Sequence, residues 1–360
     1  MTLESRIELI AEKARYWFNV ENTSLIEAAT RTYKEGFFPK SDVLYAIQCL
    51  KDSVSKEALS AWVAKAGVSK NTSEDKKVLC LHAGNLPLVG FQDVLAALLS
   101  GYDYYGKISR KDPYLLPDFL DQFNGTPLES HIHPDTDLQA FRGVKANAVT
   151  FSGSESSIPE VMEVVKAGNM ADDNCRYLIR KAHFSITYFD DFTSENSENL
   201  VNALLRYDGK GCRSVAIVVS PLKLGKISCT FTDYFESYWT KNPTHRKPSP
   251  GIKYRYAYNK AVQKVQMFLE HVIIEESIDP VPANDDIIYW VHGGLDKMVE
   301  LSDKFGDQVQ NLYVCSEKLR IPGYQEKTEL LSRAQCPFIN WKPDGIDILK
   351  WLFAVSSEQR

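Results

Sequence analysis

Hydrophobic positions follow two patterns along the chain, a helical one at the start and an alternation of strand and helix patterns after it. Up to about residue 70, apolar residues recur at helical spacing, as in Ile7, Ile10, Ala14 and Phe18, which predicts a mostly helical region. The polar tract 69–75 predicts a linker. From Val78 on, short apolar runs alternate with amphipathic stripes. This order predicts an α/β fold in which crossover helices join the strands of a parallel sheet.

The first strand and helix of this alternating region are the most sharply marked. Val78-Leu79-Cys80-Leu81 is continuously apolar, as expected for a strand covered on both faces. Pro87 suits the first turn of the next helix and Gly101 suits its end. Further predicted strands are 104–108, 148–151, 177–179, 185–189 and 215–219, and the predicted helices are 88–98, 158–167, 199–206 and 346–353.

Composition is that of an ordinary globular protein with room for two cores. The 360 residues are 44% hydrophobic, and this length favours two domains. The net charge is -5 and the Lys and Arg residues are spread along the chain, which argues against a nucleic-acid surface and favours metabolite substrates. No apolar run reaches eighteen residues and the first residues lack the features of a signal peptide. We therefore expect no membrane span and a cytoplasmic location.

Cysteine and histidine give little sign of a metal. The seven cysteines are an odd number without paired spacing, which suits reduced thiols better than a disulfide framework or a zinc site. His131 and His133 in HIHPD have no nearby Cys or third His to complete a ligand set. We therefore expect no metal.

One stretch is strongly basic. Residues 241–264 contain seven Lys or Arg and no acid. They predict either a solvated, mobile loop that runs into a helix or a patch for the phosphates of a carrier.

The turn after the first predicted strand carries candidate chemistry. Nucleotide sites usually have GxGxxG there, but this chain has Gly84-Asn85-Leu86-Pro87. The Asn85 amide could stabilise an oxyanion formed from a carbonyl, or it could cap the following helix. Lys107, at the end of the next strand, could hold nucleotide hydroxyls or phosphates, or it could be solvated.

In their order, four motifs resemble the aldehyde dehydrogenase superfamily. An Asn-x-Pro turn, a Lys-x-Ser-x-x-x-Pro strand end, a Phe-x-Gly-Ser strand end and a catalytic Gly-Cys loop match Asn85–Pro87, Lys107–Pro113, Phe151–Ser154 and Gly211-Cys212. Within the superfamily the chain looks closest to the LuxC-like acyl-CoA reductases. That narrower match rests on Gly84 before the turn, on Lys107-Ile108-Ser109 ahead of Asp112-Pro113, and on the run from Pro337 to Gly345.

The resemblance, which covers about residues 78–345, implies a Rossmann-type cofactor domain and a second α/β catalytic domain. The N-terminal helices and the NAD(P)-binding domain would take residues 1–200, the catalytic domain 201–335, and the segment 336–360 would return to the first domain. Superfamily members are usually dimers or tetramers, so a homodimer is expected. The chain is shorter than typical members, however, and the arm through which they associate could be missing.

The same resemblance implies a chemistry. The Cys212 thiolate attacks an acyl thioester, the Asn85 amide and the Cys212 backbone N–H stabilise the oxyanion, and NAD(P)H reduces the thioacyl enzyme to an aldehyde. The cofactor would lie on Lys107, Ser109, Arg110, Gly153 and Ser154. The acyl donor would be acyl-CoA or an acyl carrier protein, and LuxC-like members also use an acyltransferase partner. Lys210 and Arg213 would favour the thiolate if they point inward, but they could equally point to the surface.

Two departures from the superfamily pattern refine this expectation. Aldehyde-oxidising members place a Glu in the segment after the Gly-Ser turn, where it activates water, whereas residues 178–185 here contain no acid; this favours a reductase. In that segment His183 could act as general base or acid, or it could be structural. NAD-preferring members often carry Glu at the position of Arg110, and an Arg could bind a 2′-phosphate. We therefore expect NADPH to be preferred over NADH.

Other functions remain open from the sequence. The same residues would suit a CoA-acylating aldehyde dehydrogenase that runs in the oxidative direction. A non-catalytic acyl-binding subunit, in which all the cysteines are structural, is the alternative from another class.

Overall fold

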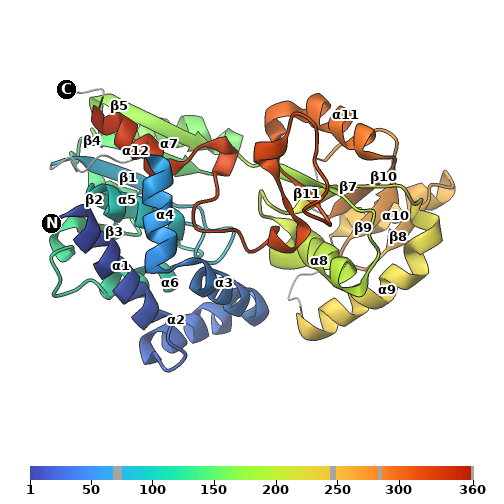
Figure 1. Ribbon diagram of the computed structural model, residues 1–360, viewed down its shortest axis with the longest axis horizontal. Helices are drawn as coiled ribbons and strands as arrows, with labels where there is room; N and C mark the ends of the chain where they lie inside the picture. Colours follow the sequence, from blue (N-terminus) through green and yellow to red (C-terminus); the bar gives the residue numbers. More distant parts are fainter. Residues whose placement is uncertain (68–74, 244–248, 283–285, 358–360) are drawn as a thin grey trace. The chain divides into compact units, whose positions relative to one another are not determined.

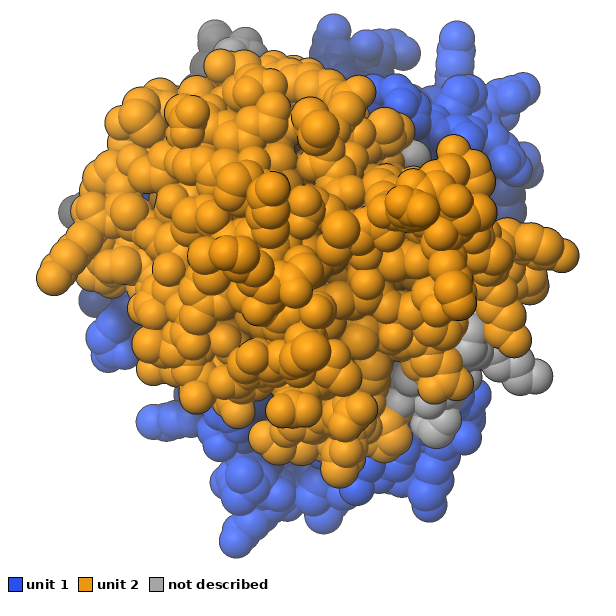
Figure 2. All heavy atoms as spheres, turned by 90° about the vertical axis from the view of Figure 1, so that its right-hand side faces the viewer, with its two compact units in different colours: residues 1–182, 337–360 blue, residues 183–336 orange. Residues whose placement is uncertain are grey.

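The computed structural model describes residues 1–67, 75–243, 249–282 and 286–357. The chain forms two compact units, one of residues 1–182 and 337–360 and the other of residues 183–336 (Figures 1 and 2). Most of the predicted linker, residues 69–74, lies outside the described residues. The first unit ends at Ala182 rather than near residue 200, because the strand that starts at Phe184 pairs within the second unit.

The first unit begins with four helices. Thr2, Asn22 and Ser55 accept backbone hydrogen bonds at the starts of three of them, as N-cap residues do. Their apolar faces, including Ile7, Ile10, Ala14 and Phe18, are buried, which confirms the helical pattern. The helices are α1 (Leu3–Trp17), α2 (Thr23–Lys34), α3 (Lys40–Ser53) and α4 (Lys56–Ala66).

The sheet of this unit is parallel throughout, with strand order β3-β2-β1-β4-β5. Val78 and Cys80 of β1 pack with helix α5, whereas Leu79 and Leu81 pack with α7 on the other face, so the continuous apolar run is explained by burial on both faces. The elements are β1 (Lys77–Leu81), α5 (Phe91–Ser100), β2 (Asp103–Lys107), α6 (Leu115–Asp121), β3 (Ile132–Asp135), β4 (Ala146–Ser152), α7 (Ile158–Ala167) and β5 (Ala171–Arg180).

The last described residues return to the first unit. Helix α12 (Ile348–Ser357) packs on α5 through Ile348, Leu349 and Leu352. Ahead of it, the Gln92 side chain donates to the backbone carbonyls of Ile339 (2.6 Å) and Trp341 (2.8 Å). The run from Pro337 to Gly345 is therefore tied to the helix that follows the Asn85 turn.

The second unit is also an α/β layer structure, with helices on both faces of a seven-stranded sheet of order β12-β11-β6-β7-β10-β9-β8. All pairs are parallel except β8 with β9. The elements are β6 (Phe184–Tyr188), α8 (Ser194–Leu205), β7 (Val215–Ser220), α9 (Leu224–Lys241), α10 (Pro250–Ala261), β8 (Gln266–Phe268), β9 (Ile273–Glu276), β10 (Ile287–His292), α11 (Leu295–Phe305), β11 (Val309–Val314) and β12 (Thr328–Leu330).

One predicted boundary is wrong. Helix α5 ends at Gly101 in the left-handed conformation, as expected, but it begins at Phe91 and not at Pro87. Leu88 has a φ of 58°, which no helix accommodates, so residues 86–90 form a separate turn.

Candidate active site

Six of the expected site residues lie at one edge of the first sheet. Lys107 is paired with Leu81, and Leu81 with Phe151, so the carboxyl ends of β2, β1 and β4 are side by side. The Asn85 turn follows β1, Ser109 and Arg110 follow β2, and Gly153 and Ser154 follow β4. Strands β2 and β3 lie on one side of β1, and β4 and β5 lie on the other, so the strand order reverses at β1. Ligands of open parallel sheets bind at such a switch point.

The glycines at this edge are required by close approaches. A Cβ on Gly84 would lie 1.9 Å from the Ser109 hydroxyl oxygen, and one on Gly153 would lie 2.5 Å from the Phe151 ring. Ser109 therefore contacts the backbone of the Asn85 turn directly, which explains why Gly84 and the Lys-Ile-Ser motif occur together. Gly153 donates its N–H to the Arg180 carbonyl (3.2 Å), and the exposed Ser154 bonds to neighbouring serine hydroxyls.

Asn85 is exposed, and it does not cap helix α5. The cap position is taken by Gly90, which has no side-chain cap. The helix-cap interpretation of Asn85 is therefore wrong, and the oxyanion role stays a prediction.

Asp112, which the sequence flagged only as part of a motif, holds the turn in place. Its buried carboxylate accepts the N–H of Leu88 at 2.7 Å, and Leu88 is the residue with left-handed backbone in the Asn85 turn. Burial raises the pKa of Asp112 to about 6, although hydrogen bonds from Leu88 and Leu115 oppose this rise. An acid just before Pro113, in a segment that follows a strand end, was the available sequence signal.

Replacing Asp112 with Asn should flatten the dependence of stability on pH. Because the pKa of Asp112 lies above its ordinary value of 3.8, the folded state holds the proton more tightly than the unfolded state. The free energy of unfolding should therefore fall by about 2 kcal/mol as the pH rises from about 4 to about 6. Denaturant titrations of both proteins from pH 4 to 7 measure this difference, and parallel curves would contradict it.

Lys107 and Arg110 place two cations together at the end of β2. Burial lowers the pKa of the half-buried Lys107, and the charge of Arg110 lowers it further, so the two groups interact. Arg110 itself is exposed. Adjacent cations of this kind suit a phosphate oxyanion, which would relieve their mutual repulsion.

In the second unit Cys212 lies in a turn that follows a strained segment. Between α8 and β7 the chain passes through Tyr207, Asp208 and Gly209, all with positive φ. The turn closes with Ser214 donating to the Gly211 carbonyl (2.8 Å), and the Ser185 hydroxyl donates to the Cys212 carbonyl (3.1 Å). Strain of this kind is held by the surrounding structure and is concentrated at functional sites.

The two basic neighbours of Cys212 do not behave alike. Arg213 is buried, bonds to Glu329 (2.6 Å) and to the carbonyls of Ala334 and Arg333, and interacts electrostatically with Cys212. Exposed Lys210 forms an ion pair with Asp208 at 3.4 Å. Arg213 therefore fixes the turn and keeps a positive charge near the thiol, whereas Lys210 points to the surface.

The other described thiols outside any disulfide are less suited than Cys212 to act as a nucleophile, because of their burial or their position. Cys80, Cys175, Cys212, Cys229 and Cys315 are outside any disulfide. Burial raises the pKa of Cys80, that of Cys175 to about 12 and that of Cys315 to about 11, and thiols of high pKa are poor nucleophiles at neutral pH. Cys229 is exposed on helix α9, where no strained turn holds it.

His183 lies at the same sheet edge as Cys212. It immediately precedes β6, and Cys212 precedes the neighbouring strand β7. Ser185 joins the two segments, because its N–H bonds to the Ser214 carbonyl (3.0 Å) and its hydroxyl bonds to Cys212. The structure thus brings the candidate nucleophile and the candidate acid or base to adjacent strand ends.

The segment 178–185, in which a water-activating Glu was sought, carries the cations Arg180 and Lys181 instead. Strand β5 ends at Arg180, whose buried guanidinium pairs with Asp93 of α5 at 2.7 Å. The next residue, Lys181, pairs with exposed Glu155 at 2.6 Å. The Arg180–Asp93 pair also ties the start of α5 to the end of β5, close to the Asn85 turn in sequence.

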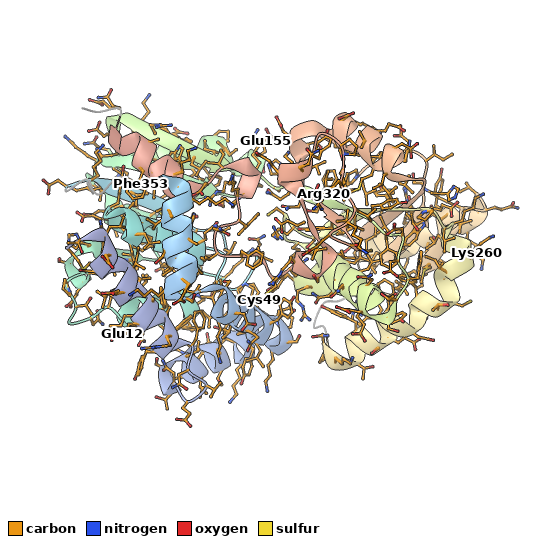
Figure 3. All side chains as sticks on the ribbon, viewed as in Figure 1. Glu12, Cys49, Glu155, Lys260, Arg320 and Phe353 are labelled. Carbon is orange, nitrogen blue, oxygen red and sulfur yellow. The ribbon has the colours of Figure 1, made fainter. Side chains whose placement is uncertain are left out.

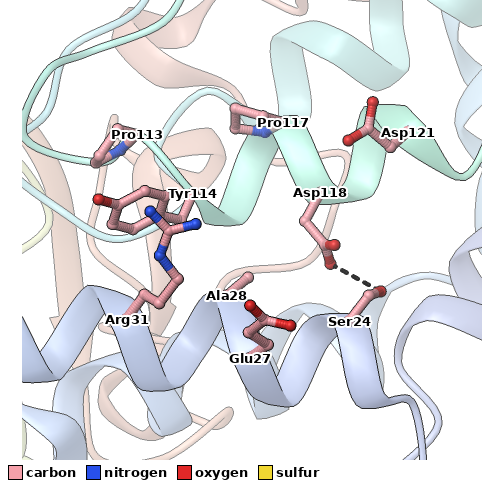
Figure 4. Close-up of a pocket in the computed structure, with 9 residues that line it drawn as sticks. All are labelled: Ser24, Glu27, Ala28, Arg31, Pro113, Tyr114, Pro117, Asp118 and Asp121. Carbon is pink, nitrogen blue, oxygen red and sulfur yellow. Dashed lines mark hydrogen bonds between the residues drawn. The ribbon is translucent and has the colours of Figure 1, made fainter.

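A separate cavity of about 300 Å³ lies between α2 and α6 (Figure 4). Asp118 on its wall accepts from the Trp17 indole N–H (2.6 Å) and the Ser24 hydroxyl (3.2 Å), and Arg31 stacks on Tyr114. None of the expected site residues lines it, and its polar groups mainly join the two helices.

The described residues show neither a metal cluster nor a membrane-spanning helix. No group of three or more His, Cys, Asp or Glu in these residues is arranged to bind a metal ion. Instead, His131 bonds to Asp103 (2.6 Å) and His133 stacks on Tyr105. No helix in the described ranges combines the length and hydropathy needed to cross a membrane.

Known structures identify the fold. Aldehyde dehydrogenase 21 from Physcomitrella patens matches 99% of this chain and 84% of its own, with a TM-score of 0.67 and 14% identity. The fold is that of the aldehyde dehydrogenases. An NAD-dependent aldehyde dehydrogenase from Sinorhizobium meliloti matches 92% of this chain and 74% of its own (TM-score 0.64, 12% identity). An oxidoreductase from Marinobacter aquaeolei matches 97% and 84% (TM-score 0.66, 10% identity).

The aldehyde dehydrogenase fold confirms the predicted architecture, a Rossmann-type unit plus a second α/β unit. No protein-family model and no curated protein sequence matches the chain. The narrower resemblance to LuxC-like acyl-CoA reductases stays a prediction.

Proposed function

We propose that the protein reduces an acyl thioester to an aldehyde with NADPH, by way of a thioacyl group on Cys212. The observation that carries this proposal is the position of Cys212, a thiol outside any disulfide that follows a strained segment, beside Arg213 and one strand from His183. A thiolate held in this way can attack a thioester, and His183 can take the thiol proton and return it to the leaving thiol.

The first unit fits a nicotinamide dinucleotide. Gly84 and Gly153 let Ser109 and Phe151 pack directly on the backbone at the switch point, and Lys107 and Arg110 present two interacting cations beside it. Lys107 and Ser109 would hold the adenosine ribose, Arg110 its 2′-phosphate, and Gly153 and Ser154 the pyrophosphate. When bound, the reduced nicotinamide supplies a hydride. The Asn85 amide would donate to the oxyanion that forms on the acyl carbonyl.

Reduction is favoured over oxidation to an acid because residues 178–185 carry no carboxylate, and Asp93 and Glu155, which reach the end of β5, are paired with Arg180 and Lys181. Residues 178–185 contain only cationic, neutral and imidazole side chains, and Arg180 is already paired with Asp93. Without the Glu that aldehyde-oxidising members use to activate water, the thioacyl group should persist until it is reduced. Adding NADPH to the acylated protein should release aldehyde, and release of free acid in its place would contradict the proposal. A scaffold protein would release neither.

Replacing Arg110 with Glu should shift the cofactor preference from NADPH toward NADH. The carboxylate would repel the 2′-phosphate and could accept hydrogen bonds from the ribose hydroxyls, so kcat/KM for NADPH should fall by about 100-fold. Lys111→Glu, one residue along, is the matched control. Equal turnover of both cofactors by the parent and by Arg110→Glu would remove support for this role.

A further inference from the structure

A buried carboxylate fixes helix α10 against the second sheet. The side chain of Glu275 on β9 is fully buried. It accepts from Arg255 (2.6 and 2.8 Å), Lys264 (2.6 Å) and Asn259 (2.7 Å). Burial alone would raise the pKa of Glu275, but these bonds lower it to about 2. Two of the seven basic residues in the stretch 241–264, Arg255 and Lys264, are therefore bonded to Glu275. Residues 244–248 of this stretch lie outside the described ranges.

The opposite face of α10 is aromatic, cationic and exposed. Tyr254, Tyr258 and Val262 follow one another at four-residue spacing and are 78%, 61% and 53% exposed. Lys253 and Lys260, seven residues apart, lie together to one side of these three residues on the exposed part of the helix, and neither forms an ion pair with any other described residue. We call these five residues the α10 surface; Lys260 is labelled in Figure 3. Val265 and Phe268 beside the edge strand β8 are also exposed, at 44% and 40%.

The exposed tyrosines and lysines of the α10 surface together indicate an acidic protein partner. From Pro250 to Phe268 there are four cations and no acid. Arg255 and Lys264 are bonded to Glu275, so the α10 surface presents two exposed positive charges, those of Lys253 and Lys260, on a chain of net charge -5. Exposed Tyr with flanking cations is typical of protein interfaces, where aromatic rings fill the centre and charges select the partner.

We propose that the α10 surface docks an acidic acyl carrier protein, which presents the acyl group as a phosphopantetheine thioester. This inference rests on the proposed function. On transfer, the Cys212 sulfur forms a bond to the acyl carbon, the thioester C–S bond of the carrier breaks, and the thiol proton of Cys212 passes to the released carrier thiol.

Three other occupants fit this surface less well. A two-fold pairing of α10 with itself would oppose Lys253 and Lys260 to the same lysines of a second copy. The phosphates of free CoA need convergent donors, whereas these lysines stand on an exposed helix face. A lipid surface would be met by Leu, Phe or Trp rather than by Tyr hydroxyls.

The test compares acyl carrier protein with CoA as the acyl donor. Lys260→Glu and Tyr258→Ala should each weaken binding of purified holo-acyl carrier protein, and raise KM for its acyl form, by about tenfold. Both should leave acyl-CoA turnover unchanged. The matched control is Lys318→Glu, an exposed lysine beyond β11, near the opposite end of the same sheet. It should bind the carrier normally.

Several outcomes would overturn the docking proposal. They are absence of carrier binding by the parent protein, equal binding by parent and Lys260→Glu, and binding of anionic phospholipid vesicles but not of the carrier. Concentration-dependent self-association that Tyr258→Ala abolishes, without carrier binding, would overturn it in favour of a dimer. Failure of the proposed function is distinct, because then neither acyl-CoA nor the acyl carrier would acylate Cys212, whether or not the carrier binds.

Discussion

Replacing Cys212 with Ala should lower the rate of aldehyde formation by a factor on the order of 10⁴ or more. The reason is that, among the described thiols outside any disulfide, no other combines partial exposure, a position just after a strained segment and a neighbouring buried cation. The acyl group would have no nucleophile, so the loss should appear in kcat and acylation should fail as well. Steady-state assays with NADPH and an acyl-CoA series measure it.

The control for this substitution is Cys229→Ala, which removes the exposed thiol of the same unit. It should retain full activity. Because Cys212 is only partly buried, both variants should unfold at nearly the same denaturant concentration as the parent. Aldehyde formation by Cys212→Ala at more than a few per cent of the parent rate would show that the nucleophile lies elsewhere.

Replacing Asn85 with Ala should lower kcat by about 10²- to 10³-fold, the effect of removing one oxyanion donor. Since Asn85 is exposed and does not cap α5, this loss should come with little change in stability. Cofactor affinity should also remain, because Lys107 and Arg110 are untouched. Stopped-flow measurement of acylation, with fluorescence titration of NADPH as the second readout, separates these effects.

Asn85→Asp serves as the companion variant. It keeps the shape of the side chain but places a negative charge beside the developing oxyanion, so it should be at least as slow as Asn85→Ala. A drop in unfolding free energy with kcat unchanged would mean that Asn85 only shapes its turn.

Much of the fold could be predicted from the sequence because the burial of a strand on one or both faces dictates which of its residues are apolar. Val78 to Leu81 is apolar at every position since α5 and α7 cover opposite faces, and Gly101 marks the end of α5 because its backbone is left-handed. The start of α5 was misplaced because Pro87 favours a helix locally, whereas a bond between residues 24 apart in sequence, from Leu88 to Asp112, imposes a turn.

The site residues differ in how readily the sequence alone reveals their roles. The glycines, Asn85 and Lys107 stand in recognisable motifs at neighbouring strand ends of the first sheet, and Cys212 stands in a recognisable motif ahead of a strand of the second sheet. Asp112, Ser185 and the Arg180–Asp93 pair act through contacts made across the sheet, and no local pattern reports such contacts. Arg213 was visible as a neighbour of Cys212, but its direction depends on Glu329, more than a hundred residues away.

The central claim, that Cys212 carries the acyl group, is tested most directly by intact-mass analysis of the protein after incubation with a series of acyl-CoAs and no cofactor. The parent should gain the mass of one acyl group, located to Cys212 by peptide mapping, and should lose it as aldehyde once NADPH is added. Cys212→Ala should gain nothing. An acyl adduct that persists on Cys212→Ala would contradict the account.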